Sequence, residues 1–156
     1  MIEVLLSGDY RGTPHDVGAW AYAIRRGEEL LGGGKGSDRP QIITSRLSAE
    51  AAALALALEE ISRGWEGEDI VVRTTSVGLQ GLLVRRGLGV PQNLARWYTR
   101  AHAAAGRCAS VRILSASPEE LASLRANAAE LLPRAEARIS IARASKLLGI
   151  IKEGQL

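Results

Sequence analysis

The feature that most constrains the fold of this chain is the stretch Leu47–Ile61, LSAEAAALALALEEI. It is the longest run of helix-forming residues without Gly or Pro. At about 100° per residue, its apolar side chains form one stripe within about 40° of Leu47. The stripe consists of Ala51, Leu54, Leu58 and Ile61. Glu50 falls about 60° to one side, on the shoulder of the stripe. We therefore predict a central helix with one carboxylate at the edge of its buried face, which is either a salt-bridged rim residue or part of a site.

Other residues of this stretch predict what surrounds the helix. Glu59 and Glu60 point well away from the stripe, so we expect both to face solvent. Leu56 lies opposite the stripe, so we expect something to cover that side: a further helix, the C-terminal tail, or a second subunit in a homodimer. Ser45 or Ser48 can cap the start of the helix, because a hydroxyl oxygen there accepts a hydrogen bond from a backbone amide.

Composition and charge define the broad class of protein. A chain of 156 residues is long enough for one domain and short for two, and its 46% apolar and 24% charged residues are ordinary for a soluble protein. The net charge of +3 permits a polyanionic partner without requiring one. The single Cys108 can form no internal disulfide and belongs to no metal-binding motif. Neither a membrane-spanning stretch nor a signal peptide is visible, so we expect a cytoplasmic protein with no membrane partner.

Apolar runs and turn residues divide the rest of the chain into short elements. The predicted strands are Ile2–Leu6, Val17–Ile24, Glu29–Lys35, Ile70–Thr75 and Ala109–Ser115. Besides the central helix, the predicted helices are Ser76–Arg86, Gln92–Ala105 and one from Ser117 to about Leu132. Ser7–Pro14 is expected to be a polar loop, and the glycines of the third strand indicate a bulge or a close backbone approach.

The order of these elements predicts a mixed α/β fold. Three antiparallel strands are followed by alternating helices and strands. A strand after a long helix favours parallel pairing with the first strand through a right-handed crossover. We therefore predict a five-stranded mixed sheet with helices packed on it. Residues 1–132 are expected to form this domain, and residues 133–156 a C-terminal helical extension packed on it or on a partner.

Four short segments occur in an order and at a spacing found in one known family. They are Ser7–Pro14 (SGDYRGTP), Gly18–Ala21 (GAWA), Thr44–Glu50 (TSRLSAE) and the pair Thr75–Ser76. They resemble four segments of the ribonuclease H family. That family ends its first strand with Asp, Gly and a loop closing Gly-Asn-Pro, continues with a Gly-aromatic-Gly strand, opens its central helix ahead of a glutamate, and ends its fourth strand with Asp-Ser. The resemblance covers roughly residues 1–132 and implies the ribonuclease H fold.

Members of that family hydrolyse the RNA strand of RNA–DNA hybrids with two divalent cations held by a cluster of about four carboxylates. The resemblance aligns the first aspartate of this cluster with Ser7 and the glutamate with Glu50. It aligns the third acid with Thr75 and the fourth with a position near Asn127, with Glu130 one turn along. Most catalytic acids are thus replaced, and a lone glutamate among hydroxyls and an amide would hold Mg²⁺ weakly.

Asp9 offers an alternative site. It lies two residues beyond Ser7 and would point to the same side if the strand continued, so a two-residue slip restores an Asp–Glu pair with Glu50. These two carboxylates would then be the metal ligands, for Mg²⁺ or Mn²⁺. The alignment on Ser7 is preferred because it also keeps Gly8 and Pro14 in place, and an aspartate in a Gly-Pro loop commonly caps a turn.

Basic, aromatic and hydroxyl side chains are the candidates for binding nucleic acid. They are Arg11, Thr44, Ser45, Arg46, Arg96, Trp97 and Arg100. The last three share one predicted helix and could grip a phosphate backbone and stack on it, although a tryptophan such as Trp97 more often packs in the core. The segment 44–46 resembles the family's backbone-reading loop; the alternative is that it only caps the helix.

The leading hypothesis is a ribonuclease H-like protein that needs no cofactor and is catalytically inactive or severely impaired. It would bind an RNA–DNA hybrid or another duplex, or serve as an interaction scaffold. The alternative is an active endonuclease that depends on Mg²⁺ or Mn²⁺ and cleaves RNA in RNA–DNA hybrids through a shifted site of Asp9, Glu50 and Glu130. A third interpretation is an assembly module whose basic surface has no role in binding.

Overall fold

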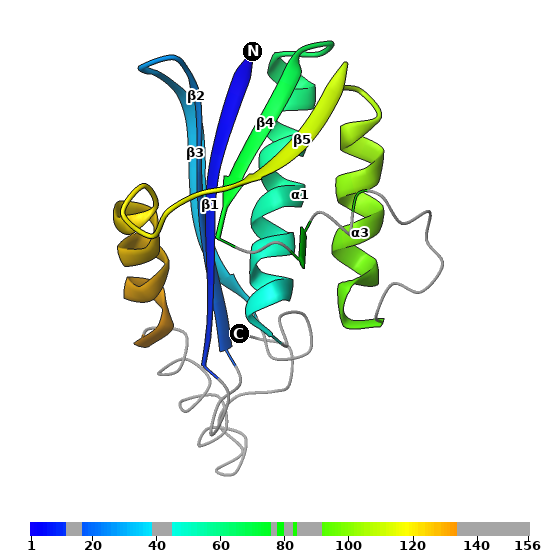
Figure 1. The fold of residues 1–156 in the computed structure, drawn as a ribbon. Coiled ribbons are helices and arrows are strands. Elements are labelled where there is room, and N and C mark those ends of the chain that lie inside the picture. The colour runs from blue at the N-terminus through cyan, green and yellow to red at the C-terminus, as the bar shows by residue number, and fades with distance from the viewer. Residues whose placement is uncertain (12–16, 39–44, 76–77, 80–82, 84–91, 134–156) are drawn as a thin grey trace, which may run out of the picture.

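A five-stranded sheet forms the middle layer of the molecule (Figure 1). This computed structural model describes residues 1–11, 17–38, 45–75, 78–79, 83 and 92–133. The strands are β1 (Ile2–Arg11), β2 (Val17–Arg26), β3 (Glu29–Asp38), β4 (Asp69–Thr74) and β5 (Ser110–Ser115). They lie in the order β3-β2-β1-β4-β5. β2 pairs antiparallel with β1 and β3, whereas β4 pairs parallel with β1 and β5. The predicted mixed sheet is therefore confirmed.

β1 is longer than the sequence predicts. Its pairing with β2 runs from Glu3 opposite Arg25 to Arg11 opposite Val17. The expected loop at Ser7–Pro14 is therefore wrong as far as Arg11. The added backbone hydrogen bonds outweigh the low strand propensity of glycine and aspartate in this segment. As a result, β2 holds the polar end of β1 within the sheet.

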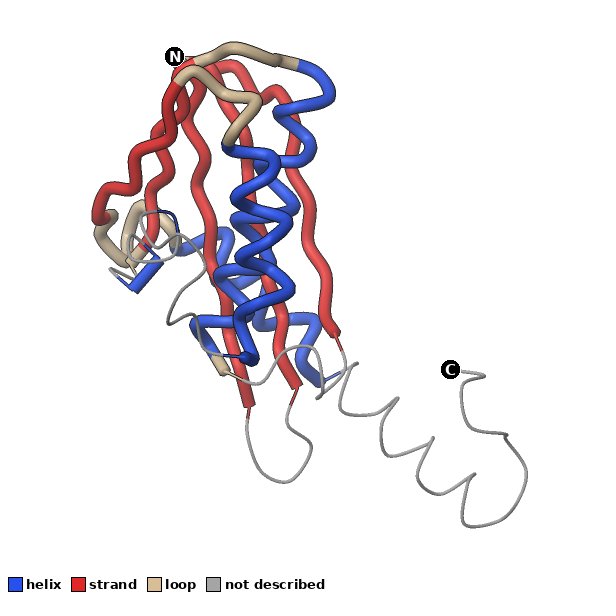
Figure 2. The backbone as a smooth tube through the Cα atoms, turned by 90° about the vertical axis from the view of Figure 1, so that its right-hand side faces the viewer, coloured by secondary structure: helices blue, strands red, loops and turns tan. Residues whose placement is uncertain are grey.

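Helices cover both faces of the sheet (Figure 1, Figure 2). α1 (Arg46–Gly64) lies along the strands on one face, and α3 (Gln92–Ala105) packs against it. Residues 122–133 form a helix on the opposite face. The bounds of α3 are those predicted from the sequence. The helix on the opposite face begins several residues later than Ser117, after a turn.

The start of α1 is capped as the sequence predicts. Ser45 Oγ accepts a hydrogen bond from Ser48 N at 3.1 Å, and Ser48 Oγ accepts one from Ser45 N at 3.0 Å. This reciprocal pair satisfies two backbone amides that have no partner within the helix. It fixes where α1 begins, beside β1.

Two apolar clusters, one on each face of the sheet, hold the layers together. The larger cluster joins the side chains of β1, β2 and β4 that face α1 to the predicted stripe of α1 and to α3. The smaller cluster joins the other side of β2 to helix 122–133. Its buried members are Val17, Ala19, Ala21, Leu121, Leu124, Ala128 and Leu132. Leu56 is half-buried against the larger cluster, so side chains of this chain cover part of that side of α1.

The expectation that Glu59 and Glu60 face solvent is wrong, because both are half-buried. Glu59 accepts two hydrogen bonds from Arg100 of α3, from Nε at 2.7 Å and from Nη2 at 2.8 Å, and these lower its pKa. Glu60 Oε1 accepts a hydrogen bond from the Tyr22 hydroxyl at 3.3 Å. Burial and the neighbouring Glu60 charge raise the pKa of Tyr22 to about 12. α1 is enclosed between the sheet and α3, so even its polar side makes contacts within the protein.

β3 has the irregularity expected from its glycines. Its pairing with β2 shifts between Ile24 and Arg25, and a Cβ at Gly34 would lie 3.0 Å from the ring of Tyr22. The glycine therefore leaves room for the Tyr22 ring on the neighbouring strand.

Two predicted segments fall largely outside the described residues. They are the helix at Ser76–Arg86, of which residues 78–79 and 83 are helical, and the extension 133–156, of which only Pro133 is described. Among the described helices, none is long and apolar enough to cross a membrane.

Candidate functional site

The end of β1 meets the start of α1 at Gly8. A Cβ at this position would lie 2.6 Å from Glu50 N and 2.8 Å from Glu50 Cγ, distances at which atoms clash. Only glycine therefore lets the helix approach the strand this closely. In the family pattern that the sequence resembles, a glycine follows the first aspartate. The contact places Gly8 directly against Glu50, whose side chain is buried.

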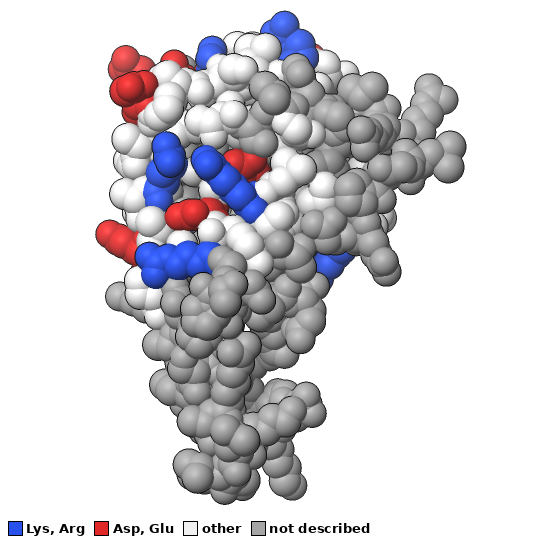
Figure 3. Space-filling model, turned by 60° about the horizontal axis from the view of Figure 1, so that its bottom comes forward, with Lys and Arg blue, Asp and Glu red and all other residues white. Residues whose placement is uncertain are grey.

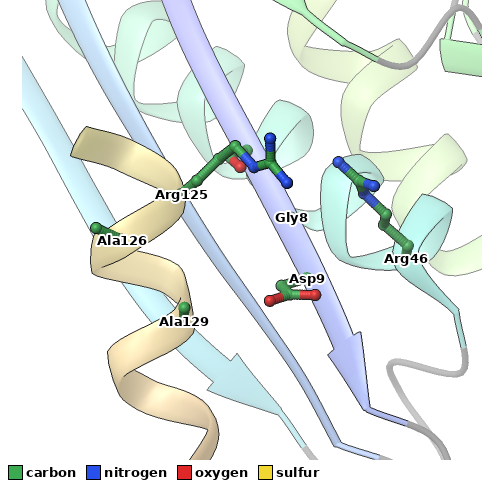
Figure 4. A pocket seen from close by; sticks show the side chains of 7 residues that line it. Gly8, Asp9, Arg46, Arg125, Ala126 and Ala129 are labelled. Atoms are coloured by element: carbon green, nitrogen blue, oxygen red, sulfur yellow. The ribbon is translucent and has the colours of Figure 1, made fainter. Parts of the chain in front are cut away.

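At this end of β1 a pocket of about 260 Å³ lies between α1 and helix 122–133 (Figure 4). Its lining residues are Ser7, Gly8, Asp9, Arg46, Arg125, Ala126 and Ala129. Ser7 and Asp9 point the same way, because they are two residues apart in a strand. Figure 4 shows the guanidinium groups of Arg46 and Arg125 reaching toward each other from opposite sides of β1, with Asp9 nearer the end of the strand.

Two neighbours hold Arg46 in place. Its Nε lies 3.3 Å from Glu50 Oε1, and its Nη2 donates a hydrogen bond to Thr75 Oγ1 at 3.5 Å. The Glu50 side chain is 1% exposed and the Arg46 side chain 51% exposed, so a buried carboxylate anchors an accessible cation. Thr75, predicted as a replaced acid, directly follows β4 and contributes to this anchoring.

Arg46 is also unusual for its place in the helix. It is the first residue of α1, whose first turn contains no acidic residue. A cation at this end opposes the helix dipole, at a cost of about 0.3–1 kcal/mol. A residue type that is unfavourable at its position in a helix is expected where the side chain serves function rather than folding. The position of Arg46 therefore points to a role in the pocket.

The residues at this pocket do not fit a centre for two divalent cations. Arg46 and Arg125 repel cations. Asp9 Oδ1 already accepts a hydrogen bond from Tyr10 N at 2.8 Å. Within the part of the chain that the structure describes, no group of three or more His, Cys, Asp or Glu side chains is arranged to hold a metal ion. A two-metal centre needs more converging oxygen ligands than this.

Helix 122–133 presents other residues to the pocket than the sequence predicts. Burial of its apolar positions in the smaller cluster fixes its rotation. In that rotation Arg125, Ala126 and Ala129 line the pocket. Asn127 and Glu130 are exposed and are not among the described residues that line it, so the helix register does not support either as a member of the site. The sequence analysis did not identify Arg125. The only sequence signal for it is the spacing of the buried apolar residues of this helix, which determines the direction in which Arg125 points.

Trp97 lies in the core rather than on the surface. It is 2% exposed and packs against Trp20, with 6.5 Å between the ring centroids. Arg96 and Arg100 lie over its ring, 5.2 and 5.1 Å from the centroid, and Arg100 also binds Glu59. Of the two predicted roles for Trp97, packing in the core and stacking on a nucleic acid, the geometry favours packing in the core, because the ring is covered and cannot stack on a base. Arg96 is exposed on α3 and stays a candidate.

Among the described residues, the predicted contacts Arg11 and Ser45 do not line the pocket. Arg11 is exposed at the end of β1, and Ser45 caps α1. Thr44 lies outside the described residues. Figure 3 shows the described surface of this end of the molecule, where basic side chains lie beside acidic ones rather than in one large basic patch. The two arginines of the pocket are therefore a local feature.

The strand order and the helices on both faces define a ribonuclease H-like fold, as the sequence predicts. RNase H1 from the halophilic archaeon Halobacterium salinarum NRC-1 matches with a TM-score of 0.68 and 20% identity, covering 85% of this chain and 98% of its own. The N-terminal RNase H domain of a Mycobacterium tuberculosis protein matches with a TM-score of 0.69 and 15% identity, over 86% and 96%. LC11-RNase H1 matches with a TM-score of 0.65 and 17% identity, over 84% and 93%. No family model matches the sequence, and no curated protein matches it either.

Proposed function

We propose that this protein binds the phosphate backbone of an RNA–DNA hybrid or another nucleic-acid duplex and does not cleave it. A nucleic-acid partner is supported by the fold, since the LC11-RNase H1 structure is a complex with an RNA/DNA hybrid. The observation that carries the proposal is the pocket at the end of β1. The sequence resemblance aligns Ser7 with the aspartate of the family pattern, and Ser7 lines this pocket together with Arg46 and Arg125.

Arginine suits a phosphate partner better than a metal partner. Its planar guanidinium is always charged and presents donors in a fork that matches phosphate oxygens. Each guanidinium at the pocket raises the free energy of a nearby divalent cation and lowers that of a nearby phosphate. These features favour binding of a backbone over assembly of a two-metal centre.

Binding and cleavage are tested on the full chain with a labelled RNA–DNA hybrid. Fluorescence anisotropy should detect binding at low salt, and the affinity should fall steeply as salt is raised, because binding releases counterions. RNA cleavage in Mg²⁺ or Mn²⁺ should not exceed that of the Glu50→Gln variant. Cleavage that this substitution abolishes would overturn the non-catalytic proposal. No binding at low salt would overturn the binding proposal and favour an assembly module.

The alternative is a Mg²⁺- or Mn²⁺-dependent endonuclease that uses a shifted site. One observation favours it: Asp9 lines the pocket. Under this alternative, Asp9→Asn would abolish cleavage, whereas the non-catalytic proposal expects no cleavage to lose. The predicted homodimer, which light scattering would test, stays a prediction, as do the helical extension and the cytoplasmic location.

A further inference from the structure

We propose that Arg46 and Arg125 clamp a single phosphodiester group of the bound strand, and that Glu50 is a positioning residue that orients Arg46. This inference rests on the proposed nucleic-acid binding and gives that binding a defined point of contact. It also gives the retained glutamate a role that needs no metal ion.

The clamp is built from helices on opposite faces of the sheet. Arg46 comes from the first turn of α1 and Arg125 from helix 122–133. Their guanidinium groups are directed toward each other over β1 (Figure 4). The two apolar clusters fix both helices against the sheet, and Glu50 and Thr75 hold the Arg46 side chain, so the helix positions of both arginines and the direction of Arg46 are set before a ligand arrives. Donors placed in advance bind with a smaller loss of conformational entropy.

The pocket has the size of a small group. Its volume of about 260 Å³ is below the roughly 300–1,000 Å³ of pockets that enclose drug-sized ligands. Gly8, Ala126 and Ala129 line it without long side chains. A backbone phosphate can therefore approach β1 while its sugars and bases stay outside.

The charges at the pocket favour a phosphodiester over a free phosphate. Glu50 lies 3.3 Å from Arg46, and Asp9 lines the pocket, so two acids accompany the two guanidinium groups. None of the ion pairs formed within the described residues involves Arg125. A phosphodiester carries one negative charge, whereas a phosphate monoester carries about −1.5 to −2 at pH 7. Asp9 would repel the additional charge of the monoester.

The test is the affinity of the full chain for a labelled RNA–DNA hybrid, measured by fluorescence anisotropy between about 50 and 200 mM salt. Arg46→Ala and Arg125→Ala should each lower the affinity about tenfold and reduce the salt slope by about one, as expected for loss of one charged phosphate contact. Arg112→Ala is the matched control, because Arg112 is exposed on β5 and does not line the pocket. It should change neither the affinity nor the slope.

Two further substitutions test the pocket without removing a charge. Ala126→Leu fills the pocket and should lower the affinity as much as Arg125→Ala. Ala122→Leu adds the same side chain at an exposed position of the same helix that does not line the pocket, and it should have no effect. Arg125→Lys keeps the charge but loses the planar fork, so it should retain only part of the affinity.

The positioning role of Glu50 is tested through Arg46. Glu50→Gln keeps an acceptor for Arg46 Nε and should retain the affinity within about twofold. Glu50→Ala should lower the affinity of the wild type but add no loss to Arg46→Ala, because a residue that acts only through Arg46 has no effect without it. Thermal unfolding checks that each variant is folded. If the Glu50→Ala variant is not folded, Glu50→Gln is compared in the same way, and a loss of affinity that Glu50→Gln adds to Arg46→Ala would refute the positioning role.

The remaining outcomes separate the clamp from the proposed function. If the wild type binds the hybrid and neither arginine variant changes the affinity, the clamp is refuted and the proposed function stands. If inorganic phosphate or a mononucleotide binds as tightly as the hybrid, the ligand is a free phosphate and the backbone clamp is refuted. If the wild type binds no hybrid at low salt, the proposed function itself is refuted.

Discussion

Gly8→Ala should both destabilise the protein and weaken the pocket. The added Cβ would lie 2.6 Å from Glu50 N and 2.9 Å from Ala49 C, and these backbone atoms cannot rotate away. Ordinary van der Waals contact begins at 3.4 Å, so β1 and α1 would have to separate by about 0.8 Å, the difference between 3.4 and 2.6 Å. Overpacking of this kind costs about 1–3 kcal/mol. The shift would also displace Arg46, so hybrid binding should weaken.

Urea unfolding measures this loss of stability. With a slope of about 1–3 kcal/mol/M, a loss of about 2 kcal/mol lowers the unfolding midpoint by about 1 M. Gly64→Ala is the matched control, because Gly64 lies in α1 and no atom is within 4 Å of the added Cβ. It should leave the stability unchanged or raise it by up to about 1 kcal/mol, since alanine favours the helix. A Gly8→Ala variant that unfolds at the wild-type urea concentration would refute the close contact between β1 and α1.

Three further predictions concern charged and polar contacts. Arg100→Ala removes two partly exposed hydrogen bonds to Glu59 and should lower the free energy of unfolding by about 1 kcal/mol. Urea unfolding measures this loss, and an unchanged midpoint would contradict the pairing of Arg100 with Glu59. Burial acts to raise the pKa of Glu3, but two arginines that bind it outweigh burial and lower the pKa below 4.5. Its stabilising contribution is therefore complete above 4.5 and is lost as the pH falls through the lowered pKa, so urea midpoints should fall in acid and Glu3→Gln should flatten this fall. The pKa of Tyr22 is raised from 10.0 to about 12, so the midpoint should fall as the pH rises through this range, and a Tyr22→Phe variant with the same alkaline loss would contradict the assignment.

Most of the fold could be predicted because it follows from local sequence. The apolar spacing of Leu47–Ile61 specifies a helix, and Ser45 supplies the cap that starts it. The bounds of α3 follow from the residues that flank Gln92–Ala105. A long helix between two strands requires a crossover, which restricts β4 to parallel pairing with β1. What local sequence did not indicate was the length of β1, because pairing with β2 overrides the turn residues of its second half.

The candidate site could be predicted only in part. The sequence resemblance assigned Ser7 and Glu50 to one site, and the contact between Gly8 and Glu50 brings the strand of the first against the helix of the second. Arg125 could not be predicted, because its direction depends on how a helix on the opposite face of the sheet is rotated by burial. The burial of Trp97 could not be predicted for the same reason, because its ring packs against Trp20, which is distant in the sequence. Contacts between layers are tertiary, and the spacing of residues within one element does not reveal them.

The most direct test is a single incubation of the full chain with an end-labelled RNA–DNA hybrid at low salt, with Mg²⁺ or Mn²⁺ present. A native gel then reports binding, and a denaturing gel reports whether the RNA strand is cut. We expect a shifted complex on the first gel and intact RNA on the second. RNA that the wild type cuts and the Glu50→Gln variant leaves intact would contradict binding without cleavage, as would the absence of any complex.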